Sequence, residues 1–291
     1  MATTAQRPLS LTALMTLGRV SNLPTVWTNV LTGVVLAGGV WHGGRTGIVL
    51  VAMSLFYVGG MYLNDYFDRG IDARERPGRP IPAGEVATEL VAAFGFGLLV
   101  GGVALLATIG LAAAICGLAL AALIVIYDLF HKGNPVAPVM MGGCRMLVYL
   151  GAAAATTGGI SGMVVIASFA LLAYIAGLTY AARQESLDRV GNLWPLAVLS
   201  APMIVALPAL AQGPLSAAIY FALVGWTTAA AYLLVRRPAP GAVSRAVAAL
   251  IAGVSLVDAA LIASLGASVP ALLALAGFAA TVLLQRYIAG T

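Results

Sequence analysis

The sequence predicts an all-α membrane protein, a polytopic bundle of transmembrane helices, and two observations carry this prediction. Of the 291 residues, 61% are hydrophobic and only 9% are charged, whereas a soluble globular protein typically carries about 25% charged residues. The apolar residues also gather in windows long enough to cross a bilayer, which takes about 20 residues of helix. Because no polar stretch between these windows is long enough to fold separately, we expect residues 1–291 to form a single transmembrane domain.

Ten apolar windows are candidates for membrane spans. They cover residues 22–41, 47–66, 88–108, 110–129, 137–157, 161–181, 194–212, 215–235, 244–265 and 269–288. The gaps near residues 109 and 267 are short, so the expected number of transmembrane helices is nine or ten. Small residues recur in these windows, for example Gly97 and Gly101, and this spacing lets helix backbones approach closely.

The positions of the charges predict how the bundle is oriented. If the amino terminus is cytoplasmic, the basic residues fall at or near cytoplasmic helix ends and only Arg45 falls outside, as the positive-inside rule requires. The acidic residues gather at the same ends, with Asp258 alone inside a span, where we expect it to be neutral or locally hydrogen-bonded. We therefore expect an integral, multi-pass protein with both termini and its site on the cytoplasmic side. The positions of the basic residues at helix ends thus explain the net charge of +5, so no nucleic-acid partner is expected.

The most informative motif lies at the end of the second window. If this segment is helical, Asn64, Asp68 and Asp72 lie on one face, with Asp65 at the edge of the same arc of roughly 100°. Crowded carboxylates repel one another unless cations neutralise them. Their hard oxygen atoms suit Mg²⁺ that also bridges a phosphate. The motif therefore predicts a Mg²⁺ and phosphate site.

A loop rich in arginine and proline follows this motif. Pro77, Pro80 and Pro82 rule out a regular helix, and Arg79 lies between the first two. Arginines beside a carboxylate face are well placed to pair with phosphate oxygens. The alternative is that they only set the membrane orientation.

A second polar patch comes at the cytoplasmic end of the sixth window, and it contains Tyr180, Arg183, Gln184, Glu185 and Asp188. On a helix, Gln184 and Asp188 share a face. Two oxygen-bearing faces at one membrane depth could hold a diphosphate between two metal ions. Alone, such a helix end is equally a solvated face.

Five further residues are candidates to bind a substrate. Lys132, the only lysine in the chain, can contact a phosphate, with Tyr127 hydrogen-bonding nearby. Arg145 lies near the start of the fifth window, where a buried guanidinium is costly without an anionic partner, either a substrate or an aspartate. The alternative is that it extends to the membrane interface. Asn22 and Asn29 are seven residues apart and share a helix face, so they can line a polar cavity or bond to another helix.

Together these motifs resemble the UbiA superfamily of intramembrane prenyltransferases. The resemblance rests on Asn64-Asp65-x-x-Asp68-x-x-x-Asp72, the Arg-Pro-Ile-Pro-Ala-Gly stretch that follows, Arg19-x-x-Asn22 before it and the segment 127–132 after it. By motif it covers roughly residues 15–190.

The resemblance implies a helical bundle around a cavity open to lipid, with two aspartate-rich motifs that bind Mg²⁺ and the diphosphate of an isoprenyl donor. Asp65, Asp68 and Asp72 would hold metal with help from Asn64, and Lys132 and Arg145 would bind the diphosphate. In the second motif Gln184 stands where the family has its first aspartate. Asp188 is retained and Glu185 is adjacent, so the metal ligand would be shifted there.

The function implied is a Mg²⁺-dependent transfer of an isoprenyl group from an allylic diphosphate to a lipophilic or aromatic acceptor through a carbocation, in contact with membrane lipid. Aromatic faces such as Tyr62, Tyr66, Tyr149 or Tyr180 could stabilise that cation. One alternative is a terpene cyclase of the same fold, in which the prenyl chain attacks itself. A ten-helix transporter is the alternative from another class.

Overall fold

The computed structural model describes residues 11–183, 194–237, 239–288 and 290. In these residues every regular element is helical, which confirms the all-α prediction. The α-helices are α1 (Leu11–Leu17), α2 (Leu23–Leu36), α3 (Gly44–Glu75), α4 (Thr88–Ala107), α5 (Leu111–Phe130), α6 (Ala137–Thr157), α7 (Gly162–Ala182), α8 (Trp194–Ala197), α9 (Ala201–Val205), α10 (Pro214–Arg236), α11 (Ala242–Ala263) and α12 (Ser268–Leu284). Three short 3₁₀ helices join them, η1 (Val20–Asn22), η2 (Val198–Ser200) and η3 (Leu207–Ala211).

Each apolar window corresponds to helical structure, but the helices differ in length. Within the described residues, seven helices are long and apolar enough to cross a membrane, namely α3, α4, α5, α6, α7, α10 and α11. Helices α2 and α12 are shorter, with 14 and 17 residues. The window 194–212 is divided into four short helices, and Pro202 and Pro208 lie at the starts of two of them, because proline cannot continue the helix before it.

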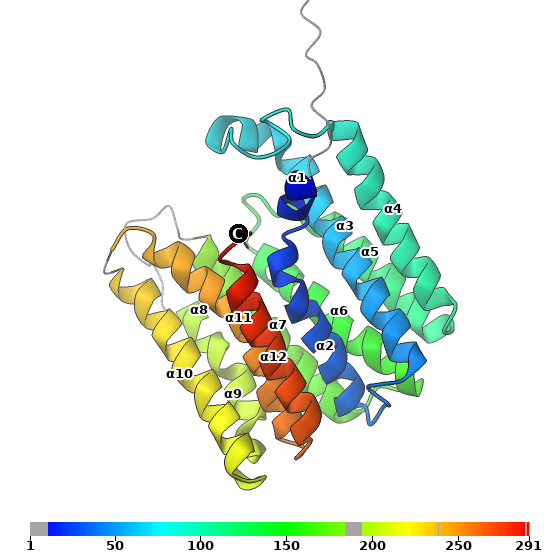
Figure 1. The fold of residues 1–291 in the computed structure, drawn as a ribbon, viewed down its shortest axis with the longest axis vertical. Coiled ribbons are helices and arrows are strands. Elements are labelled where there is room, and N and C mark those ends of the chain that lie inside the picture. Colours follow the sequence, from blue (N-terminus) through cyan, green and yellow to red (C-terminus); the bar gives the residue numbers. More distant parts are fainter. Residues whose placement is uncertain (1–10, 184–193, 238, 289, 291) are drawn as a thin grey trace, which may run out of the picture.

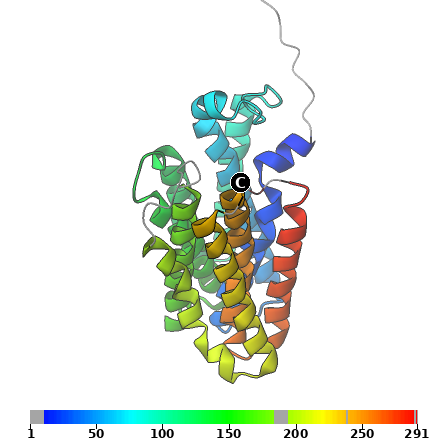
Figure 2. The ribbon, with the colours of Figure 1, turned by 90° about the vertical axis from the view of Figure 1, so that its left-hand side faces the viewer.

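Helix α3 positions the first carboxylate motif. Its 32 residues span about 48 Å, more than the roughly 30 Å of a hydrocarbon core. The Asn64–Asp72 motif therefore lies in its last turns, and the helix ends two residues before Pro77. The loop from α3 to α4 lies at one end of the bundle in both views, and α1 is near the same end (Figure 1 and Figure 2).

Helix α2 lies in the middle of the bundle and packs against α3, α6, α11 and α12 (Figure 1). Glycines allow these close contacts. A Cβ on Gly33 of α2 would come within 2.6 Å of the Tyr149 carbonyl oxygen of α6, and one on Gly142 of α6 would come within 2.5 Å of the Leu172 carbonyl oxygen of α7. Helix α6 is thus held tightly between α2 and α7.

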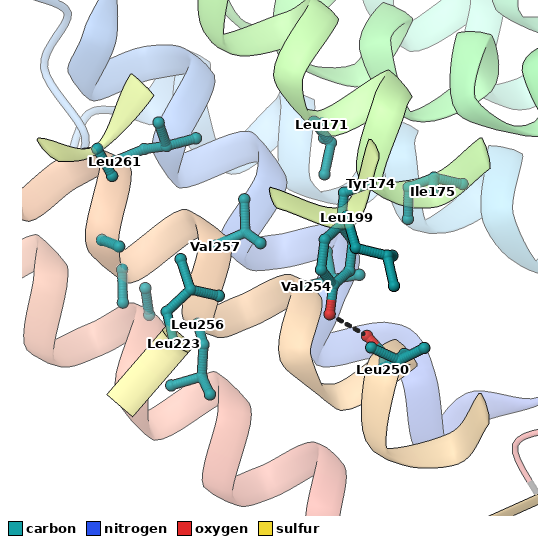
Figure 3. Close-up of a cluster of buried hydrophobic side chains, with 14 of the residues drawn as sticks. Leu171, Tyr174, Ile175, Leu199, Leu223, Leu250, Val254, Leu256, Val257 and Leu261 are labelled. Atoms are coloured by element: carbon teal, nitrogen blue, oxygen red, sulfur yellow. Dashed lines mark hydrogen bonds between the residues drawn. The ribbon is translucent and has the colours of Figure 1, made fainter. Parts of the chain in front are cut away.

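The largest apolar cluster joins α7, α10 and α11 (Figure 3). Tyr174 of α7 is fully buried there beside Leu171 and Val254, and its hydroxyl donates a hydrogen bond of 3.0 Å to the Leu250 carbonyl oxygen of α11. That bond satisfies the one polar atom that the tyrosine brings into an apolar core.

The example chosen from the sequence for glycine packing was wrong in detail. A Cβ on Gly97 would meet no atom of the described chain within 4 Å, and one on Gly101 would meet only Leu55. The close contact between α3 and α4 is made instead by Gly59 and Gly95, where a Cβ on Gly59 would lie 2.9 Å from the Gly95 carbonyl oxygen. Spacing alone did not reveal which face of α4 meets α3.

These contacts predict different outcomes for two glycine substitutions. Gly142→Ala sets a methyl group against the α7 backbone, which cannot move aside as a side chain does, so we expect a loss of about 1–3 kcal/mol of stability. Gly97→Ala is the matched control, because its methyl group meets open space. Thermal unfolding of the purified protein in micelles should show a lower midpoint for the first variant only. Equal midpoints would contradict the close α6–α7 contact.

Candidate functional site

One cavity of about 630 Å³ opens among α2, α3, α5, α6, α7 and α11. One part of its lining is charged or polar and includes Asn64, Asp68 and Asp72. Another part is apolar and includes Met53, Phe56, Leu120 and Val148, and the charged side chain of Arg145 on α6 also lines the cavity. Such a cavity fits a molecule that has an anionic head and an apolar body.

Asp65 is held by two arginines. Its Oδ1 atom lies 3.2 Å from Nη2 of Arg19 and 2.8 Å from Nη1 of Arg79, and Arg19 also donates to Oδ1 of Asn64 at 3.2 Å. Both arginines line the cavity, whereas Asp65 is not among the lining residues that the structure describes. Asp65 thus holds two guanidinium groups that line the cavity.

Asp68 is paired with the segment that follows α5. Its Oδ2 atom lies 3.1 Å from Nζ of Lys132 and 3.4 Å from Nε2 of His131, whose ring stacks on Tyr127 with centroids 5.0 Å apart. These residues all line the cavity. Sequence reasoning missed His131, although it stands next to Lys132 in the same segment.

Two buried carboxylates have oxygen atoms left for another ligand. Asp72 lines the cavity and takes part in none of the ion pairs between described residues. Oδ1 of Asp128 accepts a hydrogen bond of 3.2 Å from Asn64, but its Oδ2 atom is buried with no hydrogen-bond partner. Sequence reasoning counted Asp128 only as one more acidic residue at a helix end. The signal that could have found it is its position four residues before Lys132.

The second patch is described only in part. Arg183 lines the cavity and donates to the carbonyl oxygens of Asn134 at 2.7 Å and His131 at 3.3 Å, which ties the end of α7 to the loop after α5. Tyr180 is partly buried and is absent from the described lining. Gln184, Glu185 and Asp188 lie outside the described residues.

Asn22 lines the cavity but is also bonded to the last part of the described chain. Its Nδ2 atom donates to the Gly290 carbonyl oxygen at 2.7 Å, and its Oδ1 atom accepts from Gln285 at 2.9 Å. The side chain is thereby fixed at the cavity wall.

The aromatic lining differs from the expected set. Phe56, Tyr57 and Tyr127 line the cavity. Tyr62 and Tyr149 are bonded elsewhere, since the Tyr62 hydroxyl donates to the Leu14 carbonyl oxygen and the Tyr149 hydroxyl donates to Asp258. The sequence alone did not show which face of each helix meets the cavity.

The residues present fit a divalent cation that a substrate phosphate also ligates. No group of three or more histidine, cysteine or acidic side chains in the described part of the chain is arranged to hold a metal ion alone. Mg²⁺, however, is commonly bound by only one or two carboxylates together with substrate phosphates and water. The unpartnered Oδ2 atom of Asp128 and the unpaired carboxylate of Asp72 can supply such ligands.

Fold and site together define an integral membrane protein with a charged, substrate-sized cavity inside its helical bundle. Residues 25–245, well over half of the chain, match the UbiA prenyltransferase family. The chain belongs to the UbiA prenyltransferase family, and its class of activity is prenyl transfer.

Curated relatives agree with this assignment. The digeranylgeranylglyceryl phosphate synthase of Halobacterium salinarum is 34% identical over 194 residues, which cover 64% of this chain and 68% of the relative. The synthase of the same name from Methanothrix thermoacetophila is 34% identical over 108 residues, covering 37% of this chain and 40% of the relative.

Two solved structures share the fold. The apo structure of a UbiA homolog from Aeropyrum pernix K1 has a TM-score of 0.65 at 17% identity and covers 84% of this chain and 96% of that one. A structure described as giving insights into digeranylgeranylglyceryl phosphate synthase in membranes has a TM-score of 0.63 at 21% identity, covering 89% of this chain and 98% of that one.

The shared carboxylate of Asp65 gives a prediction for stability. Asp65→Ala leaves two guanidinium groups without their partner, and we expect a loss on the order of 3 kcal/mol, the low end for a buried ion pair. Arg79→Ala should cost less, because Arg19 still neutralises Asp65. Unfolding midpoints in micelles measure both.

A double-mutant cycle supplies the control for this ion pair. Once Asp65 has been replaced, Arg79→Ala should add almost nothing, because the two side chains no longer interact. Strictly additive losses would show that the pair contributes no coupling energy.

Proposed function

We propose that this protein transfers an isoprenyl group from an allylic diphosphate to a lipophilic or aromatic acceptor, with Mg²⁺ bound at the carboxylates of α3 and α5. The observation that carries the proposal is one cavity that has carboxylates and basic side chains in one part of its lining and apolar side chains in another. An isoprenyl diphosphate has the same division between a charged head and an apolar chain.

The basic side chains bind the diphosphate in this proposal. Arg79, Lys132 and Arg183 line the cavity near the carboxylates and present N–H donors to phosphate oxygens. In the structure Lys132 is paired with Asp68, so binding a diphosphate and a cation exchanges one charge partner for another at each of these residues. Neither the lysine nor the aspartate is then left without a partner of opposite charge.

The cation site uses Asn64, Asp68, Asp72 and Asp128 as oxygen donors, with Asp65 beside them fixing the arginines. When Mg²⁺ is bound there, it neutralises negative charge that builds on the departing diphosphate. Gln184, Glu185 and Asp188 complete the site from the segment after α7 in this proposal.

The apolar lining controls what happens to the prenyl group. The allylic C–O bond breaks with its electron pair going to the diphosphate, and the carbocation that remains must be kept from water. Met53, Phe56 and Leu120 provide a dry wall, and the ring of Tyr57 offers a π-face to the cation. An acceptor atom then donates an electron pair to the cationic carbon and releases a proton.

The acceptor and the orientation belong to the proposal as well. The relatives' name joins geranylgeranyl groups to a glyceryl phosphate, which supports a donor of several isoprene units and a lipophilic acceptor. The basic residues around the cavity support a site and termini on the cytoplasmic side, in contact with membrane lipid. The family match favours prenyl transfer over the cyclase and transporter alternatives.

The main prediction concerns pyrophosphate release. Purified protein incubated with C10, C15 and C20 allylic diphosphates and a membrane extract as the source of acceptor should release pyrophosphate only when Mg²⁺ is present. Asp68→Ala should lower the rate about 100-fold or more, because it removes a cation ligand and the partner of Lys132.

Glu89→Ala is the matched control, since Glu89 is an exposed carboxylate in the first turn of α4, outside the described cavity lining. Its rate should equal that of the wild type. Turnover that survives chelation of Mg²⁺, or that Asp68→Ala leaves intact, would overturn the proposed chemistry. A terpene formed without any acceptor would identify a cyclase.

A further inference from the structure

Gln285, at the end of α12, contacts a polar side chain of the cavity wall. Helix α12 packs beside α2 (Figure 1), and Gln285 directly follows its last residue. Nε2 of Gln285 donates to Oδ1 of Asn22 at 2.9 Å and to the Ala248 carbonyl oxygen of α11 at 3.3 Å. Asn22 is buried and lines the cavity, whereas Gln285 is partly buried and is absent from the described lining.

These contacts fix the orientation of the Asn22 carboxamide. A glutamine side chain has two N–H donors, and Gln285 uses them on Asn22 and Ala248. Oδ1 of Asn22 therefore faces Gln285, while its Nδ2 atom donates to the Gly290 carbonyl oxygen at 2.7 Å. A rotated carboxamide would set Nδ2 against the Gln285 donor and Oδ1 against a carbonyl oxygen, and both hydrogen bonds would be lost.

One N–H of Asn22 remains for a ligand. The Nδ2 atom carries two donors, and the described residues accept one hydrogen bond from it. Arg19, three residues earlier, also lines the cavity and contacts Asn64 and Asp65. Asn22 thus belongs to the charged part of the lining, where the diphosphate binds in the proposed function.

We propose that Gln285 is a positioning residue of the diphosphate site. It holds the Asn22 carboxamide so that the remaining N–H donates to an oxygen atom of the diphosphate, and the Gly290 carbonyl oxygen holds the same group from its other side. This inference rests on the proposed function. It gives a role in the site to a residue beyond the segment 25–245 that matches the family.

A carboxamide that is oriented before the ligand arrives binds an anion at lower cost. The two ends of the group are nearly equal in shape, but only the nitrogen can donate a hydrogen bond to a phosphate oxygen. Without Gln285, the Asn22 side chain would lose rotational freedom when the ligand binds, and that loss would reduce the affinity. With Gln285 in place, the orientation is already selected.

Binding of Mg²⁺-pyrophosphate tests this role without turnover. Calorimetric titration of the purified protein in micelles measures the affinity. Asn22→Ala should weaken binding about tenfold or more, as expected for one hydrogen bond to a charged group. Gln285→Met has a similar length but lacks both donors, and it should weaken binding about threefold or more, because the ligand itself must then orient the carboxamide.

A double-mutant cycle separates positioning from a purely structural role. In the Asn22→Ala background, Gln285→Met should cause no further loss of affinity, because Gln285 acts through Asn22. Tyr287→Ala is the matched control, since Tyr287 follows Gln285 by two residues, is 85% exposed and lies outside the described lining. It should bind Mg²⁺-pyrophosphate as the wild type does.

Gly290→Ala tests the other contact of the carboxamide. A Cβ on Gly290 would lie 2.7 Å from Oδ1 of Asn22, so one of the two residues must move, and either movement breaks the hydrogen bond between them. This variant should also weaken binding of Mg²⁺-pyrophosphate. Because Gly290 lies outside the helices, it keeps the test open even if Gln285→Met does not fold.

Wild-type affinity in both Gln285→Met and Gly290→Ala would overturn the inference. An equal loss from Gln285→Met with and without Asn22 would overturn it too, because that is the result of a residue that only stabilises the fold. The proposed function fails separately. A protein that shows the expected changes in affinity but never releases pyrophosphate from an allylic diphosphate would refute prenyl transfer and leave the positioning role standing.

Discussion

Charge buried in a poorly solvated interior is the constraint on which this structure depends. A carboxylate or guanidinium inside a helical membrane bundle is stable only when another group compensates it. The buried charges of this protein are compensated in different ways. Asp65 is shared by two arginines and Asp68 by a lysine and a histidine, whereas Asp258 is compensated by neutral hydrogen-bond donors. Asp72 and the buried Oδ2 atom of Asp128 have the least compensation among these groups.

The backbone arrangement follows from the same constraint. Helix α3 is longer than the membrane core, so its last turns place the buried carboxylates beside the charged loop that follows it. Helix α2 is short and central, and glycine at position 33 brings it close enough to α6 for Asn29 to bond to Arg145. Backbone approach and polar pairing are therefore linked, because a wider gap between α2 and α6 would break the hydrogen bond on which the guanidinium depends.

The sequence predicted the parts of this site that lie on a single helix. It did not predict the parts that depend on contacts between two helices. Helical periodicity was enough to place Asn64, Asp68 and Asp72 on one face, and hydropathy was enough to find the helices. Asp128 and His131 join the site through contacts with Asn64 and Asp68 of α3, and no local sequence pattern predicts these contacts. The hydrogen bond between Asp258 and Asn29 could not be predicted either, because the two residues are 229 positions apart in the chain. Long-range pairing decides these roles, and a single sequence carries little record of it.

The hydrogen bonds between α2 and the last helices have a consequence for how the protein is made. Asn22 is bonded to Gly290 across 268 residues, and Asn29 to Asp258 across 229. The ribosome synthesises α2 long before α11 and α12, so Asn22 and Asn29 are first inserted without their final hydrogen-bond partners. The cavity lining is thus completed only when α11 has been inserted. Until then, α2 carries polar groups whose partners lie on segments not yet synthesised.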